Sequence, residues 1–219
     1  PSALRGKRVL VTAGPTREPV DPVRFLSNRS SGRMGVEIAQ AAWRRGADVT
    51  MIAGPLEVDA PVGAQRIDVE TTREMRDAVA DALPSADVLV MAAAPTDFTV
   101  ESPAATKIKK AGAPDTLPLS RTDDILVTTR AHRPPHAVIV GFALETGDAL
   151  KEGRRKRADK SLDFVVINDA TEAGAGFAVD TNRVTIIGPD DVEVALPLMS
   201  KRAVADALLD RIAERLHGR

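Results

Sequence analysis

Short, almost wholly apolar runs recur along this chain, and segments with helical periodicity separate them. Residues 7–13, 48–53, 87–94 and 137–143 are rich in Val, Ile, Leu, Met and Ala, with few polar interruptions. Strands that are apolar on both faces are typical of parallel sheets covered by helices on both sides. The pattern therefore predicts an α/β, Rossmann-like fold with a mostly parallel sheet and helices on both faces.

Residues 65–69 and 164–168 predict further strands, and residues 183–187 and 192–196 predict a C-terminal β-hairpin that precedes a closing helix at 200–216. Further helices are predicted at 31–45, 71–83, 122–130 and 148–161. Thr71 and Glu74 have the spacing of a capping box at the start of their helix. With no internal repeat, the chain is predicted to form a single domain over residues 1–219.

The connection between the first strand and the first helix is unusually long. It runs over the 22 residues 14–35, GPTREPVDPVRFLSNRSSGRMG, whereas strand–helix connections usually take about 2–6 residues. Its SSGRMG end lies at a helix start, where free backbone N–H groups and the helix dipole favour an anion. We therefore predict a loop that binds phosphate.

Composition excludes several classes of protein. Lys and Arg total 30 against 31 Asp and Glu, so there is no overall basic charge to favour nucleic acid. The sequence has no Cys, which excludes disulfides and thiolate metal ligands and fits the cytoplasm. Its three His residues lack zinc-site spacing. No apolar run reaches the ~18 residues of a membrane span, and no signal peptide is recognisable.

Asp97 and the lysines are the first candidates for chemistry. Asp97 follows an apolar strand and its small residues Ala92 and Ala93, so its carboxylate could bind a hydroxyl, an amine or Mg²⁺, or could cap a turn. Three of the eight lysines fall in the KIKK run at 107–110, and Lys156 and Lys160 lie one helical turn apart. These side chains could neutralise a polyphosphate, with KIKK as a closing strap, or form a solvated surface.

Arg24, Asn28 and Phe142 each allow two interpretations. The Arg24 guanidinium could bind a phosphate in bidentate fashion, and the Asn28 amide could donate to a developing oxyanion. A structural turn would use Asn equally well. Phe142, at the end of a buried strand, could stack on a base or belong to the core.

Two other functions remain open at this point, a flavin- or NAD(P)-binding oxidoreductase domain and a nucleotide sensor without catalysis. No GxxxxGK[ST] run is present, so the chain is not a P-loop NTPase. The first strand is not followed by GxGxxG, and the sequence has no Tyr for a Tyr–Lys acid–base pair. Both absences count against a dehydrogenase.

Five runs, in this order, resemble the phosphopantothenate–cysteine ligase family: TAGPTREPVDPVRFLSNRSSGRMG, AAAPTDF, KIKK, VGFALET and KRADKSLDFVVIN. They cover most of the chain up to about Asn168, and the first is long and specific. One departure is Thr122-Asp123-Asp124, where many relatives have Asn-Pro-Asp. This change adds a negative charge near the expected nucleotide.

The resemblance implies CTP-dependent ligation of 4′-phosphopantothenate to cysteine in coenzyme A biosynthesis. The substrate carboxylate would attack the α-phosphate of CTP to give an acyl-cytidylate and pyrophosphate. The amine of cysteine would then attack the acyl carbon and release CMP. The family further implies Mg²⁺ on the triphosphate, a homodimer whose subunits close each other's sites, and a fused flavin-dependent decarboxylase. The start at Pro1 fits the C-terminal half of such a fusion.

The resemblance also assigns site residues. The nucleotide would contact Met91, Ala92, Ala93, Asp97, Lys107, Asp123, Asp124, Ile125, Leu126, Phe142, Lys156 and Lys160. Phosphopantothenate would contact Gly14, Arg24, Asn28, Ser30, Ser31 and Gly32. Asn28 would touch the acyl group of the intermediate, Lys107 would stabilise phosphate charge, and Asp97 is the candidate metal ligand.

Overall fold

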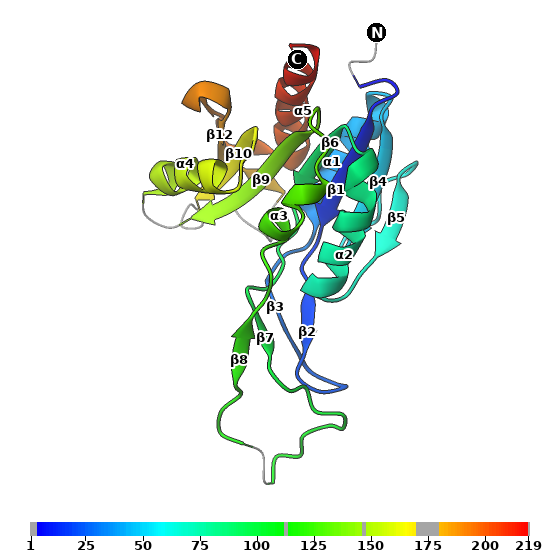
Figure 1. Cartoon of the computed structure of the whole chain (residues 1–219), viewed down its shortest axis with the longest axis vertical. Helices are drawn as coiled ribbons and strands as arrows, with labels where there is room; N and C mark the ends of the chain where they lie inside the picture. Colours follow the sequence, from blue (N-terminus) through cyan, green and yellow to red (C-terminus); the bar gives the residue numbers. More distant parts are fainter. Residues whose placement is uncertain (1–3, 112–113, 146–147, 170–179, 219) are drawn as a thin grey trace.

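An eight-stranded sheet forms the centre of the molecule (Figure 1). The structure, a computed structural model, describes residues 4–111, 114–145, 148–169 and 180–218. The sheet order is β13-β12-β10-β9-β6-β1-β4-β5. These strands are β1 (Arg8–Ala13), β4 (Asp48–Ala53), β5 (Gln65–Asp68), β6 (Val88–Met91), β9 (Val138–Glu145), β10 (Phe164–Asp169), β12 (Val184–Ile187) and β13 (Glu193–Ala195).

Six strands, from β5 across to β10, are parallel, and β12 and β13 form the antiparallel C-terminal hairpin at one edge. The order of the parallel strands reverses between β1 and β6, which is the topological switch point of a doubly wound sheet. The α/β, Rossmann-like architecture and its terminal hairpin are therefore confirmed.

Helices cover both faces, and the strand side chains alternate between two cores. The helices are α1 (Arg33–Arg44), α2 (Thr72–Ala82), α3 (Ile125–Thr128), α4 (Ala149–Asp159) and α5 (Lys201–His217), with short 3₁₀ turns η1 (Leu83–Ser85), η2 (Arg130–His132) and η3 (Pro189–Asp191). Val9 and Val11 pack with α1 and α5, whereas Leu10 between them packs on the α2 side. The capping box of Thr71 and Glu74 is present at α2. Among the described residues, every helix is too short or too polar to cross a lipid bilayer.

Two predicted elements are shorter than expected. The strand predicted at 87–94 ends at Met91, because the chain then turns so that Ala94 forms an isolated bridge with Pro15. The helix predicted at 122–130 is a single α-helical turn that passes into the 3₁₀ turn η2. Its start is displaced because Asp124, rather than Thr122, is the N-cap.

The long polar connections contain strands that the sequence did not predict. The 14–35 connection forms the ribbon β2 (Arg17–Pro19) and β3 (Phe25–Ser27), and the stretch after β6 forms β7 (Phe98–Val100) and β8 (Leu119–Arg121). These ribbons and their connections, described at 16–28, 97–111 and 114–122, extend together away from the sheet (Figure 1), and we call them the arm. A third pair, β11 (Thr181–Asn182) and β14 (Met199–Ser200), was also missed.

Buried hydroxyl groups join the base of the arm to the body. The hydroxyls of Thr16, Thr72 and Thr96 lie 2.8–3.4 Å from one another. The buried Glu18 carboxylate accepts a hydrogen bond of 2.7 Å from the Thr72 N–H at the start of α2. Since buried polar groups are costly unless paired, this network fixes where the arm leaves the sheet.

Three glycines bring the start of α1 onto the end of β1. Gly14 and Gly32 adopt φ values of 80° and 79°, which favour glycine. A Cβ on Gly32 would lie 3.2 Å from the Gly14 backbone, and one on Gly35 would lie 2.6 Å from the Ala13 Cβ. The glycines therefore take the places of a GxGxxG turn, with the β2–β3 ribbon inserted after the first.

Gly35→Ala should destabilise the domain, because its methyl group would force α1 away from β1. Overpacking of this kind costs about 1–3 kcal/mol, measurable as a lower midpoint of urea unfolding. Gln40→Ala, on the same helix, is the matched control and should change stability by less than ~0.5 kcal/mol. A Gly35→Ala protein as stable as the control would contradict the close packing.

Candidate active site

Two adjoining cavities lie where β1, β6, β9 and β10 end. The larger, of about 360 Å³, extends from the start of α1 to the last turn of α4. The smaller, of about 160 Å³, lies over the start of α3. Both are lined by Asp97, Phe142 and Lys160. The carboxyl edge of the sheet at its switch point is where this fold binds ligands.

Most of the predicted site residues line these cavities although they come from distant parts of the sequence. The larger cavity contains Asn28, Ser30, Ser31, Gly32, Ala92, Ala93, Asp97, Phe142, Lys156 and Lys160. The smaller contains Met91, Ala93, Asp97, Asp123, Asp124, Ile125, Leu126, Phe142 and Lys160. Their roles toward a ligand stay predictions.

Three predicted residues line neither cavity. Gly14 lies beneath the SSG turn, where it contacts Gly32 and supports the turn rather than facing the cavity. Arg24 and Lys107 both lie on the arm, and Lys107 is exposed there. A direct contact of these two side chains with a ligand in the cavities of the same chain is therefore not seen in this arrangement.

Arg24 belongs instead to a clamp that links the two ribbons of the arm. Its guanidinium pairs with Asp21 and donates a 3.0 Å hydrogen bond to the carbonyl of Ile108, the second residue of KIKK. The Ile108 N–H donates to the Asp21 carboxylate at 3.1 Å. Asp21 and Arg24 thus hold the backbone of the KIKK run directly beside Lys107.

The extra carboxylate of the Thr122-Asp123-Asp124 departure is neutralised. Asp123 pairs with Arg76 of α2. Asp124 accepts a hydrogen bond from the Val127 N–H as the cap of α3 and pairs with Lys160 at 2.7 Å. The altered run therefore keeps a helix start and adds no unpaired negative charge beside the smaller cavity.

Asn28 is held by hydrogen bonds to the chain after β6. Its Nδ2 donates to the carbonyls of Ala94 and Pro95 at 3.2 and 2.9 Å. These bonds fix the 14–35 connection against the neighbouring strand end, so Asn28 positions the cavity wall. Contact with an acyl group would require Nδ2 to give up one of these acceptors.

Phe142 lies partly exposed between the two cavities and also packs against the core. Both roles predicted for it are therefore compatible with its position. A base in the smaller cavity could contact the exposed part of the ring, while the remainder stays part of the packing of β9.

The site offers a metal one carboxylate rather than a cage. Asp97 is exposed and reaches both cavities. In the described part of the chain, no group of three or more His, Cys, Asp or Glu residues could hold an ion. Mg²⁺ commonly binds through one or two carboxylates plus substrate phosphates, so this donor set fits an ion carried by a nucleotide.

Several cavity residues were not among the assigned site residues. They are Arg33, Met34, Ala94, Pro95, Thr96, Thr122, Ala143, Leu144, Asn168, Asn182 and Lys201. Arg33 and Met34 belong to SSGRMG, so the helix start that indicated an anion site could have included them. Asn182 and Lys201 carry no local signal, because only the course of the C-terminal region brings them to the sheet edge.

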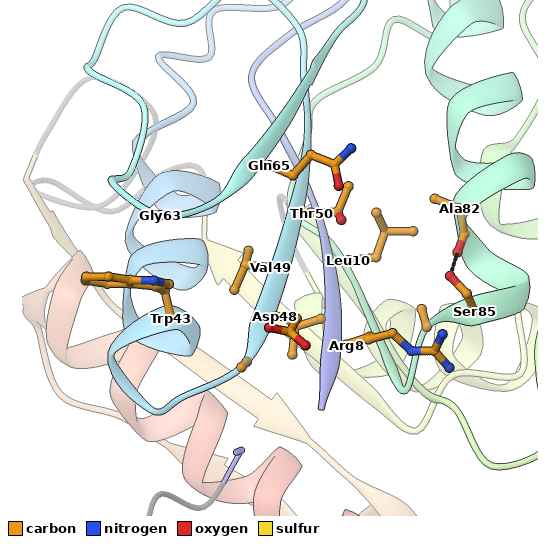
Figure 2. Close-up of a pocket in the computed structure, with 13 residues that line it drawn as sticks. Arg8, Leu10, Trp43, Asp48, Val49, Thr50, Gly63, Gln65, Ala82 and Ser85 are labelled. Atoms are coloured by element: carbon orange, nitrogen blue, oxygen red, sulfur yellow. Dashed lines mark hydrogen bonds between the residues drawn. The ribbon is translucent and has the colours of Figure 1, made fainter. Parts of the chain in front are cut away.

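Another cavity, of about 480 Å³, lies at the amino ends of the parallel strands, on the side of the sheet away from the two adjoining cavities (Figure 2). Arg8 and Asp48 line it at the amino ends of β1 and β4, with Trp43 and Gln65 nearby. Ligands in open α/β sheets bind at the carboxyl ends instead. Because this cavity lies at the amino ends of the strands, we do not assign it to the active site, although its volume is greater.

Asp21→Asn should loosen the KIKK run. The Arg24 guanidinium, followed by the backbone N–H groups of Val23, Ile108 and Arg24, holds the pKa of the Asp21 carboxyl well below its usual range, against the opposing effect of burial. The carboxylate therefore stabilises the fold above about pH 4 and loses this effect as the pH falls further. We expect faster trypsin cleavage at KIKK and a lower Tm at pH 7, with a Tm difference that shrinks below about pH 4.

Asp48→Asn is the control, because Asp48 is exposed and lies outside the arm. Equal cleavage rates and equal Tm values for the Asp21→Asn and Asp48→Asn proteins would rule out the clamp.

Comparison with known proteins gives one family. The model of the DNA/pantothenate metabolism flavoprotein C-terminal domain matches residues 4–216. The coenzyme A biosynthesis bifunctional protein CoaBC of Bacillus subtilis (strain 168) is 44% identical over 96% of this chain. The match covers 52% of that protein, so the chain spans about half the length of this curated relative.

Comparison with solved structures agrees with this family assignment. The C-terminal domain of a coenzyme A biosynthesis bifunctional protein CoaBC has a TM-score of 0.85 and 33% identity, with 100% of both chains covered. Cab2, solved in complex with phosphopantothenate-cysteine, shares the fold at a TM-score of 0.78 and 17% identity, with 98% of this chain and 88% of that one covered. The chain therefore belongs to the DNA/pantothenate metabolism flavoprotein C-terminal domain family, as the resemblance of its sequence to the phosphopantothenate–cysteine ligases predicted.

Proposed function

We propose that this domain joins 4′-phosphopantothenate to cysteine, with CTP as the activating nucleotide. One observation carries the proposal: the SSG turn, Asn28, Lys156 and Lys160 line a single cavity at the switch point of the sheet. Membership of the family and the product-like ligand of Cab2 support the choice of substrates.

The two cavities suit the two halves of an acyl-cytidylate. The smaller cavity, with Phe142 and the backbone near Met91, would take the cytidine, and Lys156 and Lys160 would face its phosphates. The SSG turn and Asn28 lie at the other side, where phosphopantothenate would bind. The residues of the two cavities would hold the carboxylate of phosphopantothenate near the α-phosphate of CTP and neutralise the charge of the phosphates. The scheme therefore requires no protein nucleophile. Mg²⁺, held by the phosphates and Asp97, would withdraw charge from the triphosphate.

A homodimer is the second part of the proposal. The arm exposes five large apolar side chains on one extended structure, those of Val23, Phe25, Phe98, Leu117 and Leu119. Exposed apolar groups gathered in this way are typical of protein–protein contacts. In such a dimer the arm could bring Lys107 to the partner's cavity, which would reconcile its expected role with its position on the arm.

The remaining parts concern the whole protein. We propose that a flavin-dependent decarboxylase domain is fused to this one, since the curated relative is bifunctional and about twice as long. A single ligase domain over residues 1–219 and a cytoplasmic location complete the proposal, the location being supported by the cysteine-free composition.

The wild-type protein should release pyrophosphate from CTP when phosphopantothenate and Mg²⁺ are present, and CMP once cysteine is added. Coupled pyrophosphate detection and chromatography of the nucleotides measure the two steps. Binding of CTP without its consumption would favour a nucleotide sensor instead. Absorbance of a bound flavin at roughly 340–460 nm would favour an oxidoreductase domain. ATP in place of CTP tests the nucleotide choice.

Asn28→Ala should lower kcat by about 10²–10³ or let the acyl-cytidylate accumulate, because a positioned donor near the acyl group is lost. Lys107→Ala should lower turnover about tenfold or more through loss of a charge-assisted phosphate contact. Lys110→Ala, in the same KIKK run, is the matched control and should stay close to wild type. Unchanged rates for both test variants would contradict their assigned roles.

Leu119→Glu should convert the dimer to a monomer, because a charge at an apolar interface is costly to bury. Light scattering after size-exclusion chromatography measures the mass. Val62→Glu is the control, since Val62 is exposed on the body rather than on the arm. A Leu119→Glu protein that remains dimeric would exclude an arm-mediated contact at this residue.

A further inference from the structure

The larger cavity ends in a corner where three distant segments meet. Arg33 begins α1, Asn182 ends β11, and Lys201 begins α5, and all three line the cavity. The pairing of β11 with β14 brings the start of α5 to this place, since the Lys201 N–H donates to the Asp180 carbonyl at 3.0 Å. We call Arg33, Asn182 and Lys201 the corner. The family resemblance assigned none of the three a role.

Asn182 brings a buried side-chain amide to the corner. The residue is 1% exposed, and within the described part of the chain neither its Oδ1 nor its Nδ2 has a hydrogen-bond partner. Asn168 lines the same cavity, and its Oδ1 is also buried without a hydrogen-bond partner among the described residues. Unpaired buried amides are costly and rare, so a polar group that enters the cavity would gain by pairing with them.

Lys201 and Arg33 make the corner cationic. Lys201 is 3% exposed, so its side chain lies inside the protein, near Arg33, rather than in solvent. Burial, and then the charge of Arg33, lower the pKa of the Lys201 ammonium, while Asp180 acts in the opposite direction. Arg33 pairs with Asp180 at 2.8 Å, and the Asp180 side chain is itself largely exposed. An anion placed in the corner would therefore relieve the repulsion between the two cations.

The start of α1 also favours an anion in the corner. The first turn contains no acidic side chain, and Gly32 provides no side-chain cap. The hydroxyls of Ser30 and Ser31 accept long hydrogen bonds, of 3.3 and 3.4 Å, from the backbone N–H groups of Gly32 and Arg33. A bound anion could compete for these donors, and the helix dipole would favour it.

We propose that the corner is a phosphate subsite in which Asn182 and Lys201, together with Arg33 and the start of α1, bind a phosphoryl group of a substrate. The Asn182 Nδ2 would donate to a phosphate oxygen, and the Lys201 ammonium would neutralise its charge. The source of the phosphate rests on the proposed function, because both phosphopantothenate and CTP carry one. Anion binding itself does not depend on that function.

Titration with inorganic phosphate and with pyrophosphate tests the subsite directly. Calorimetry of the full chain should show binding to wild type that Lys201→Ala weakens about tenfold or more, since a charge-assisted contact is lost. Lys201→Arg should restore part of the affinity. Arg202→Ala, at the next and exposed position of α5, should bind as wild type does. Equal affinity of Lys201→Ala and wild type would overturn the proposal.

Asn182→Asp provides a second variant in case Lys201→Ala does not fold. It keeps the size of the side chain and supplies Lys201 with an internal carboxylate, so the Tm should be maintained while phosphate binding is lost. A folded Asn182→Asp protein that binds both anions as wild type does would also overturn the proposal.

Steady-state kinetics with Lys201→Ala distinguish the sources of the phosphate. An increase of about tenfold or more in KM for phosphopantothenate alone would assign the corner to the substrate phosphate, and the same change for CTP alone would assign it to the nucleotide. No change in either KM, with unaltered anion titrations, would refute the subsite. Wild type that binds phosphate but shows no turnover would refute the proposed ligase function and leave the subsite supported.

Discussion

The close approach of α1 to β1 is the contact on which the rest of the site depends. Gly35 leaves no room for a methyl group against Ala13, and Gly32 lies directly on Gly14. The chain therefore returns, after the long 14–35 connection, to the point where it left β1. This return places the SSG turn over the carboxyl end of β1, beside the end of β6, so a ligand there meets the start of a helix and two strand ends together.

The residues between Gly14 and Gly32 can then form an outgrowth without disturbing the sheet. The β2–β3 ribbon pairs with the segment after β6 through buried threonines at its base and through the Asp21–Arg24–Ile108 clamp farther out. Two segments that are about 80 residues apart thus behave as one arm. Because KIKK is part of this arm, the position of Lys107 depends on Asp21, a residue with no contact to either cavity.

Charge pairing explains how the site tolerates its unusual residues. The extra carboxylate of Asp123 is balanced by Arg76 from α2, and Asp124 is balanced by Lys160 while it caps α3. At the other end of the larger cavity, positive charge is concentrated instead, on Arg33 and the buried Lys201. Cationic side chains from the end of α4, the start of α1 and the start of α5 therefore line the larger cavity.

The sequence by itself determined the layered α/β fold, because apolar runs such as that of β4 and the capping box of Thr71 and Glu74 are local patterns that the packing then uses. It also identified most residues of the cavities, since SSGRMG, AAAPTD and the Lys156–Lys160 pair lie at strand or helix ends. Only the tertiary structure decided the rest. The three-residue strands of the arm lack a period long enough to recognise, and the partner of Arg24 depends on pairing across the arm. Asn182 and Lys201 reach the cavity because β11 pairs with β14, a contact between segments that carry no signal of their own.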